Sequence, residues 1–220
     1  MANASLTPIL SNFEKLFSKL NERFYNNELQ APVITISPDT TKGAYGWCTG
    51  WRAWAEKSLK DLASMTPEEA KAAENSGYYE INLCAEHIAR SYIEVAETLL
   101  HEMVHLYNLQ EQVQDTSRGG FYHNKHFKAA AEDHGLVCEK TPKYGFSKTV
   151  FTDEAREFVE SLGETQFSLY RHGEPKAISS SKKSSSRKYV CPCYRAIIRA
   201  TKEVRVICAE CDVEFEEVEC

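Results

Sequence analysis

The longest uninterrupted helical pattern in the chain runs from Tyr92 to Asn108. Apolar residues recur there at steps of three and four positions, and neither Gly nor Pro interrupts the run. These apolar positions are Tyr92, Ile93, Val95, Ala96, Leu99, Leu100, Met103, Val104 and Tyr107. Thr98, His101, His105 and Asn108 share another face of the same helix. The pattern therefore predicts a largely buried helix that presents one polar stripe to a cleft.

Shorter patterns predict the elements that precede this helix. Residues 13–25 have the apolar spacing of an amphipathic helix, and residues 33–36 form a β-rich run after Pro32. Residues 43–51 read as a strand or hairpin, and residues 78–83 as a third strand. We therefore expect an α+β fold with a small three-stranded sheet backed by helices. The core or the wall of a cleft is the expected place for the tryptophans Trp47, Trp51 and Trp54.

The predicted helix carries the motif His-Glu-x-x-His at residues 101–105. Residues four positions apart on a helix lie on one face, so His101 and His105 can bind one zinc ion with Glu102 beside it. The alternative is a surface helix with two solvated histidines, but the apolar neighbours on both sides indicate burial. A catalytic zinc site usually has three protein ligands, so a third must lie downstream.

Several residues are candidates for the third ligand. A metzincin would need histidine six positions after His105, where this chain has Glu111. A gluzincin would use a glutamate from a later helix, for which Glu132 is the candidate. A histidine after a loop is the remaining option, and His123 and His126 both follow the glycines at positions 119 and 120.

The motif and the segment after it resemble the SprT-like zinc metallopeptidases. In that family a His-Glu-x-x-His helix is followed by a polar loop and by a third histidine that opens a helix, four residues before a phenylalanine. Residues 101–105, the loop 115–120, His123 and Phe127 match this order. The resemblance also extends to residues 24–36, and so covers about the first 150 residues.

The resemblance implies a zincin-like domain and a zinc-dependent endopeptidase. It favours His123 over His126 as the third zinc ligand, and it makes Glu102 the general base that takes a proton from water and passes it to the leaving amine. It also implies that the substrate is protein bound or crosslinked to DNA. Nothing in the sequence ranks the other groups that could contact a ligand or stabilise the oxyanion, namely Tyr122, His126 and Tyr144.

Two cysteine pairs near the C-terminus predict a second metal site. Cys191 and Cys193 are followed, after β-type residues, by Cys208 and Cys211, which is the arrangement of a zinc ribbon with four thiolate ligands. The second pair has the expected C-x-x-C spacing, whereas the first is C-x-C and has Tyr194 where the usual cysteine would stand. Either Cys193 replaces it through a tighter turn, or the site is weakened, or a ligand comes from Cys220. A β module of this size should need its metal to fold.

The charge is distributed unevenly along the chain. Residues 1–175 carry a net charge of −8, residues 176–205 contain nine Lys or Arg and a single acid, and the last fifteen residues contain six acids. We expect a metallopeptidase domain over residues 1–170, a Ser/Lys-rich flexible linker over 171–188 and a zinc-ribbon-like module over 189–220. The basic linker and module are the expected contact with DNA, and protein is the expected substrate.

The remaining features bound the cellular setting. No basic-then-apolar leader opens the sequence, and no apolar run approaches the roughly 20 residues needed to cross a membrane. We therefore expect an intracellular protein, cytoplasmic or associated with the nucleoid, with no membrane partner. Two other functions remain open: a non-catalytic zinc protein that binds DNA as an adaptor, and a general metallopeptidase without dependence on DNA.

Overall fold

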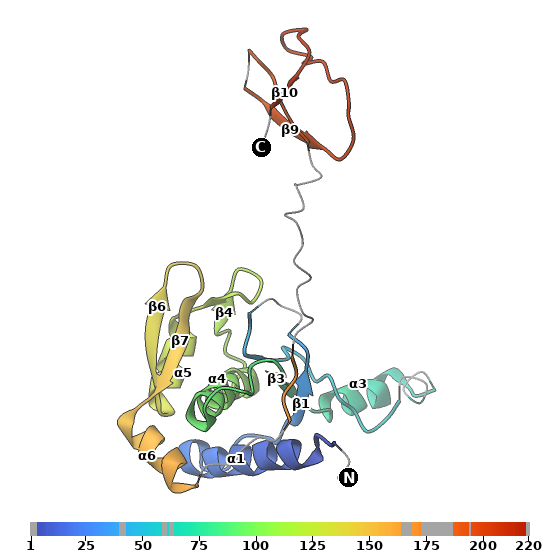
Figure 1. Ribbon diagram of the computed structural model, residues 1–220. Coiled ribbons are helices and arrows are strands. Elements are labelled where there is room, and N and C mark those ends of the chain that lie inside the picture. Colours follow the sequence, from blue (N-terminus) through green and yellow to red (C-terminus); the bar gives the residue numbers. More distant parts are fainter. Residues whose placement is uncertain are drawn as a thin grey trace. The chain divides into compact units, whose positions relative to one another are not determined.

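The computed structural model of the chain describes residues 4–39, 43–58, 61, 64–163, 169–172, 187–193 and 195–218 (Figure 1). It divides into two compact units, Met1–Gly173 and Glu174–Cys220. Most of the linker expected from the sequence lies outside the described residues, as do Tyr194 and Cys220. The domain boundaries drawn from the sequence therefore stay predictions.

Two long helices form the centre of the first unit. Helix α1 (Thr7–Tyr25) begins six residues before the periodic pattern and ends at Asn26, which adopts the left-handed conformation with φ 52°. Helix α4 (Tyr92–Gln110) begins with a capping box between Ser91 and Glu94, in which each side chain accepts a hydrogen bond from the other residue's backbone amide. Both helices predicted from apolar spacing are therefore confirmed, and their apolar faces form the core of this unit.

A three-stranded sheet packs against these helices, as the sequence predicted. It contains β1 (Val33–Ser37), β2 (Gly46–Cys48) and β3 (Glu80–Cys84) in the order β1-β3-β2. Strand β1 is parallel to β3, whereas β2 is antiparallel to β3 and forms one edge of the sheet. The segment 43–51 thus supplies one short edge strand and no hairpin. Helix α3 (Pro67–Asn75) stands out from the rest of the unit in Figure 1.

A second sheet in the same unit was not predicted. Its strands are β4 (Thr116–Ser117), β5 (Tyr122–His123), β6 (Leu136–Thr141) and β7 (Gly145–Phe151), in the order β4-β5-β7-β6. Helix α5 (Lys125–Asp133) lies between β5 and β6 in the sequence, and α6 (Asp153–Ser161) follows β7. Strands of two residues carry no periodic signal, which explains why the sequence did not reveal β4 and β5.

The position of His123 corrects one detail of the sequence analysis. This histidine was expected to open a helix, but it lies in β5, and α5 begins at Lys125. Asn124 caps that helix by accepting hydrogen bonds from the amides of His126 and Phe127. His123 is therefore held by sheet hydrogen bonding, in which its amide donates to the carbonyl of Tyr144 over 2.9 Å.

Gly145 is required where β7 pairs with β5. Its φ of +70° is unfavourable for other residues, and a Cβ at this position would overlap the carbonyl of His123. We expect Gly145→Ala to lower the free energy of unfolding by about 2 kcal/mol or more, because neither backbone segment can move without breaking the pairing. Urea denaturation measures this change. Gly50→Ala, at a position with no neighbour within 4 Å, is the control and should have little effect.

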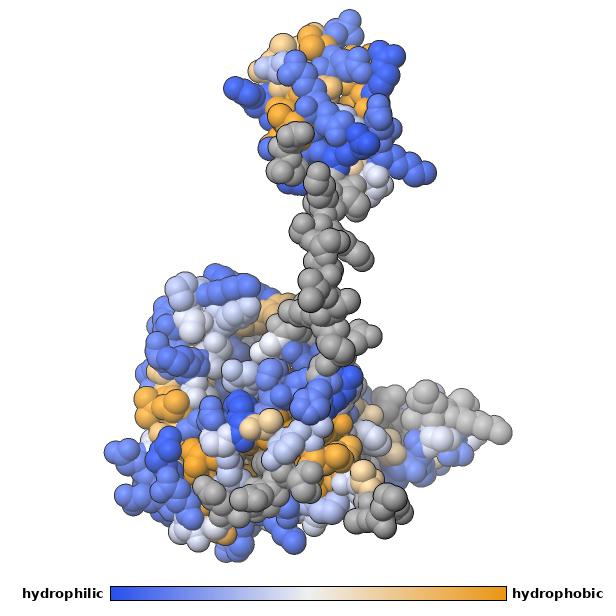
Figure 2. All heavy atoms as spheres, viewed as in Figure 1, coloured by the Kyte–Doolittle hydropathy of each residue, from blue (hydrophilic) through white to orange (hydrophobic). Residues whose placement is uncertain are grey.

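The second unit is a small antiparallel sheet. Its strands are β8 (Arg187–Val190), β9 (Ile197–Ala200) and β10 (Glu216–Val218), in the order β10-β8-β9. The sequence thus predicted correctly that β structure follows the linker. Figure 2 shows hydrophobic and hydrophilic residues mixed on the surface of this unit. No helix among the described residues is both long enough and apolar enough to cross a bilayer.

Candidate metal centre and catalytic site

Three histidine side chains converge in the first unit. His101 and His105 come from one face of α4, and His123 comes from β5. The Nε2 atom of His123 lies 3.2 Å from Nε2 of His101 and 3.1 Å from Nε2 of His105. The buried ring of Phe127 packs against all three imidazoles, with centroid distances of 4.6–4.7 Å. A helix face, a strand and one aromatic ring thus place three nitrogens around a single point.

The spacing of these nitrogens fits a metal ion. Zinc binds histidine nitrogen at about 2.0–2.1 Å, so two nitrogens of a tetrahedral site lie about 3.3 Å apart. The separations of 3.1 and 3.2 Å are close to this value. Carboxylate and sulfur ligands are absent from the group, which among the described residues contains His101, His105 and His123 alone.

Hydrogen bonds to the other ring nitrogens fix two of the imidazoles. Nδ1 of His105 donates to the carboxylate of Asp115 over 2.7 Å, and Asn108 donates to the same oxygen over 3.2 Å. Nδ1 of His101 lies 3.0 Å from the hydroxyl of Thr149. A proton on Nδ1 leaves the lone pair of Nε2 directed at the common point, which is the form that binds metal.

His123 supplies a further sign that a cation belongs at this point. Its Nδ1 is buried and has no hydrogen-bond partner in the described part of the chain. If Nδ1 carries the proton, three Nε2 lone pairs face one another and repel. If Nε2 carries it, the proton can satisfy only one of the two facing nitrogens. A metal ion removes this conflict, because all three lone pairs then have a partner.

The electrostatic surroundings favour neutral imidazoles at two of the three positions. Burial, together with the neighbouring histidines, holds the pKa of His101 well below its ordinary value. Burial and the charge of His105 lower the pKa of His123 to about 4. Burial also opposes the charged form of His105, but the hydrogen bond to Asp115 and the negative charges of Glu102 and Asp115 outweigh it, so the pKa of His105 is raised.

Glu102 lies next to the cluster and is only 5% exposed. The backbone amide of Cys48, in the edge strand β2, lies close enough to this carboxylate to favour its charged form. Burial raises the pKa of Glu102 to about 7, although the nearby His105 opposes the shift. Gly46 makes this approach possible, because a Cβ there would stand 2.7 Å from the carbonyl of Asn82 and 3.3 Å from Cγ of Glu102. A carboxyl group with a pKa near neutrality is suited to accept and return protons.

Other residues singled out in the sequence lie outside the cluster. His126 is exposed, and Glu132 is paired with Lys128 over 2.8 Å at the surface. Tyr122 is half-buried beneath the guanidinium of Arg118, which lies 4.7 Å from the ring centre. Tyr144 is exposed and contacts His123 through its backbone carbonyl. His126 and Glu132 are therefore not members of the histidine group, whereas the roles suggested for Tyr122 and Tyr144 stay predictions.

Two residues that hold the histidines were missed in the sequence. Asp115 is 8% exposed and begins the polar loop that the family pattern includes, but nothing in its spacing marks it as a partner of His105. Thr149 lies in β7, forty-eight positions after His101, and the packing of β7 against α4 brings the two together. Asn108, in contrast, belongs to the polar stripe predicted on α4.

A second group of ligand-type atoms lies in the second unit. The sulfur atoms of Cys191, Cys208 and Cys211 lie within 4.8 Å of one another, and those of Cys191 and Cys211 are 3.6 Å apart. Cys193 is exposed, although its thiol contacts that of Cys211. Burial, followed by hydrogen bonding with the other three thiols, raises the pKa of Cys211 to about 12. Four sulfur atoms therefore gather at one end of the sheet, three of them more closely than the fourth.

The two cysteine turns have the same backbone geometry. The backbone amide of Cys191 donates to the carbonyl of Ala196, and the carbonyl of Cys191 accepts from the amide of Arg195. Cys208 makes the same two hydrogen bonds, with Val213 and Asp212. Arg195 and Asp212, each four residues after the first cysteine of its turn, have φ of 56° and 54°. The position equivalent to Cys211 in the first turn is residue 194, which lies outside the described residues. Cys193 is thus one position short of it, which explains its looser placement.

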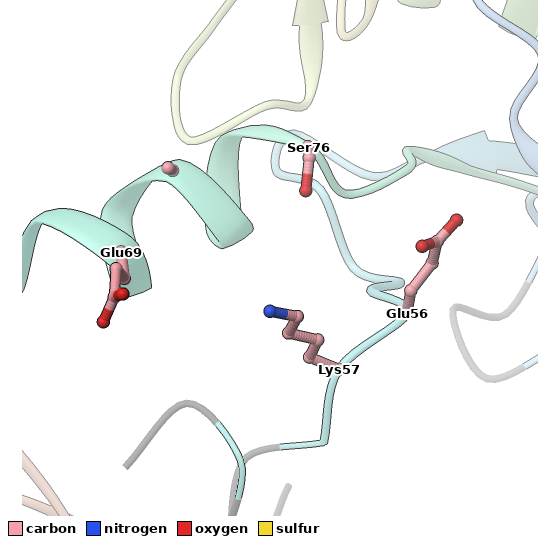
Figure 3. Close-up of a pocket in the computed structure, with 5 residues that line it drawn as sticks. Glu56, Lys57, Glu69 and Ser76 are labelled. Atoms are coloured by element: carbon pink, nitrogen blue, oxygen red, sulfur yellow. The ribbon is translucent and has the colours of Figure 1, made fainter. Parts of the chain in front are cut away.

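Two pockets of the first unit lie away from the histidine cluster. One has a volume of about 330 Å³ and lies between α3 and the preceding loop, where Figure 3 shows Glu69 and Ser76 on one side and Glu56 and Lys57 on the other. A second, of about 350 Å³, lies between the end of α1 and the start of α6 and is lined by charged side chains such as Arg23 and Glu154.

Comparison with known proteins identifies the family. The sequence model of the SprT-like family matches residues 13–144, which begin within α1, end at the residue before β7, and include all three histidines and Glu102. No curated protein and no solved structure matches the chain. Family membership indicates a metallopeptidase-like domain and implies a bound metal ion. Since the match covers more than half of the chain, the chain belongs to the SprT-like family.

Proposed function

We propose that this protein is a zinc-dependent endopeptidase with a zincin-like first unit. The observation that carries the proposal is the convergence of three Nε2 atoms at 3.1–3.2 Å beside the buried carboxylate of Glu102. His101, His105 and His123 would hold the ion. A zinc ion held there would supply Lewis acidity, which polarises the scissile carbonyl and makes water a stronger acid.

Glu102 would carry the proton transfers. Its carboxylate lies on the turn of α4 that carries His101, close to the backbone amide of Cys48. It would accept a proton from the attacking water and then donate it to the nitrogen of the leaving group. A site that only holds metal for structural reasons has no need of a buried acid at this position, so Glu102 argues against the non-catalytic adaptor.

The edge strand β2 would bind the substrate backbone. One edge of β2 pairs with β3, and in the order β1-β3-β2 no strand of the described residues pairs with the other edge. An extended polypeptide can add to such an edge through main-chain hydrogen bonds. Because Cys48 also contacts Glu102, a peptide paired with β2 would pass beside the catalytic carboxylate.

The second unit would bind a structural zinc ion through cysteine. Cys191, Cys208 and Cys211 supply three close sulfur atoms, and Cys193 would complete the set by a small movement of its exposed turn. The module has little apolar core, so the metal would contribute much of its stability.

We propose DNA-associated or DNA-crosslinked protein as the substrate, with the basic segment as the contact to DNA. The family resemblance and the nine basic residues of positions 176–205 support this. Ion pairs within the second unit weaken it, since Arg187 pairs with Glu217 over 3.0 Å and Arg205 pairs with Glu214 over 2.9 Å. Part of the positive charge is thus neutralised by the acidic strand β10 and the loop before it. This observation favours, as the second candidate, a general metallopeptidase without dependence on DNA.

A charge-reversal experiment separates these two candidates. If the basic segment contacts phosphates, Lys182→Glu/Lys183→Glu in the full chain should weaken DNA binding about tenfold at low salt, and binding by the wild type should fall steeply as salt rises. Fluorescence anisotropy with labelled single-stranded and duplex DNA measures both effects. Lys15→Glu/Lys19→Glu on the exposed face of α1 is the control. Absence of binding by the wild type at low salt would favour the general metallopeptidase.

Asp115 tests the proposed metal centre without measuring activity. We expect Asp115→Asn to weaken zinc binding at the histidine cluster by about 10- to 100-fold, because the amide cannot hold the Nδ1 proton of His105 as the carboxylate does. Competition with a chromophoric chelator measures the affinity. Asp133→Asn, an exposed aspartate at the end of α5, is the control. Equal affinities for wild type and Asp115→Asn would contradict the assignment of His105 as a ligand.

The proposed function itself is tested by combining metal analysis with proteolysis. The purified chain should contain zinc, cleave unfolded casein, lose this activity with a zinc chelator and regain it when zinc is restored. Cleavage of a protein crosslinked to DNA should exceed cleavage of the same protein without DNA. If the zinc-loaded chain cleaved neither substrate, the result would favour the non-catalytic DNA-binding adaptor.

A further inference from the structure

Two tryptophans beside the edge strand are exposed, which excludes the core, one of the two places expected from the sequence. Trp51 is 68% exposed and Trp54 is 45% exposed. Thr49 and Trp54 pair with Glu80 and Tyr78 of the neighbouring chain segment, so the four residues 50–53 lie opposite Tyr79 alone. Residues 49–54, which we call the Trp51 loop, therefore bulge out of the sheet directly after β2.

Hydrogen bonds hold the Trp51 loop in place. The hydroxyl of Thr49 donates to the carbonyl of Trp51 over 2.8 Å. Arg52 donates to the side chain of Gln30 and to the carbonyl of Gly77, each over 2.6 Å, and its guanidinium lies 4.8 Å from the ring centre of Tyr79. Because these contacts fix the backbone on both sides of Trp51, the loop cannot bury this indole by folding back onto the sheet.

The Trp51 loop continues the path of β2 beside α4, the helix that carries Glu102. Strand β2 follows α4, since Gly46 lies against Thr98 and Glu102, and the amide of Cys48 reaches Glu102. In the Trp51 loop, the side chain of Arg52 donates a hydrogen bond to the side chain of Gln30. The backbone amide of Gln30 in turn donates to the side chain of Gln110 at the end of α4. An extended peptide paired with β2 would therefore reach the Trp51 loop after about three residues, or roughly 10 Å, from Cys48.

The chemistry that the loop offers is apolar. Its only cation, Arg52, is engaged by Gln30, Gly77 and Tyr79. The indole N–H of Trp54 donates to Glu80 over 2.6 Å, and the second oxygen of Glu80 accepts from Thr35. The loop therefore offers a ligand the apolar surface of its indoles and no available positive charge. The surrounding part of the chain, residues 1–175, has a net charge of −8. These features disfavour a phosphate backbone and favour an uncharged, bulky side chain.

We propose that Trp51 and Trp54 form a subsite for a bulky apolar side chain of the substrate, three or four residues from the scissile bond. The inference rests on the proposed peptidase function and adds a substrate class to it. Folded proteins bury most of their large apolar side chains, so a peptidase that requires one in an extended segment acts on unfolded or locally unfolded polypeptide. The charged pocket between Lys57 and Glu69 in Figure 3 is unsuited to this role.

Cleavage of a diverse peptide library by the zinc-loaded full chain, read by mass spectrometry, tests the inference. We expect Phe, Leu, Met and Trp to be enriched about tenfold at one fixed position, three or four residues from the cleaved bond. Trp51→Ala should remove most of this enrichment while cleavage continues at other sequences, and Trp51→Phe should retain much of it. Tyr170→Ala removes an aromatic side chain that is as exposed as Trp54, and it should leave the profile unchanged.

The outcomes separate the inference from the proposed function. If the wild type cleaves no peptide in the library, the peptidase function fails. If it cleaves without an apolar preference at a fixed position, or if Trp51→Ala keeps that preference, the subsite is wrong. A preference for Lys or Arg that disappears in Trp51→Ala would also overturn the subsite. The same conclusion would follow if Trp51→Ala lost binding to single-stranded DNA while its cleavage profile stayed unchanged. Thermal unfolding of each variant verifies that the exposed substitutions leave the fold intact.

Discussion

Replacement of Glu102 by glutamine should abolish proteolysis while leaving the metal in place. Glutamine has nearly the same shape as glutamate and can still contact the amide of Cys48, but it cannot accept a proton from water. Loss of a general base lowers the rate by about 10²- to 10⁴-fold. Cleavage of casein or of a fluorogenic peptide, together with zinc analysis of the same preparation, measures both consequences.

The matched control for this variant is Glu111→Gln, which removes a charge at the exposed C-cap of the same helix. It should retain the activity of the wild type. If Glu102→Gln kept more than a few per cent of wild-type proteolysis with full metal content, the role assigned to Glu102 would be wrong. If it lost both metal and activity, Glu102 would support the structure of the site and could not be assigned the proton transfers.

His123→Ala should release the metal from the first unit, whereas His126→Ala should not. The Nε2 atom of His123 lies 3.1 and 3.2 Å from those of the two helical histidines, while His126 is exposed on α5. With two histidines left, the site loses one of three strong ligands, and we expect its zinc affinity to fall by at least about 100-fold. Zinc analysis after dialysis against a weak chelator measures the loss.

A Cys191→Ser/Cys208→Ser/Cys211→Ser background isolates the effect of the two histidine substitutions, because it removes the three closest sulfur ligands of the second unit. In that background the His126→Ala chain should keep one zinc ion and the His123→Ala chain none. The reverse order would assign the third ligand to His126. Full metal content in both variants would point to Glu132 and a gluzincin arrangement, although Glu132 is paired with Lys128 at the surface.

The sequence was most informative where the structure depends on local spacing. Helix α4 and the common face of His101 and His105 follow from a repeat of three to four residues and from the capping residues at Ser91 and Glu94. The approach of His123 to that face could be expected only from the family pattern. Its strand β5 is two residues long and is held by a pairing with Gly145, which lies twenty-two positions away.

The parts that could not be predicted depend on long-range contacts. Thr149 and Asp115 carry no marked spacing, and their roles arise from a four-stranded sheet that the apolar pattern does not reveal. The sequence indicated the core or the wall of a cleft for Trp51 and Trp54, and the structure excludes the core, because both side chains are exposed and Trp51 lies in a four-residue bulge after β2. Aromatic residues predict burial on average, but hydrogen bonds such as those of Arg52 can hold them at the surface.

Anomalous diffraction at the zinc absorption edge from crystals of the zinc-loaded chain tests the central claim most directly. The account predicts an anomalous peak about 2.0–2.1 Å from Nε2 of His101, His105 and His123, with the carboxylate of Glu102 nearby and not bound to the metal. No peak between the three histidines in a chain that contains zinc, or a peak bound by His126 or Glu132 in place of His123, would contradict it.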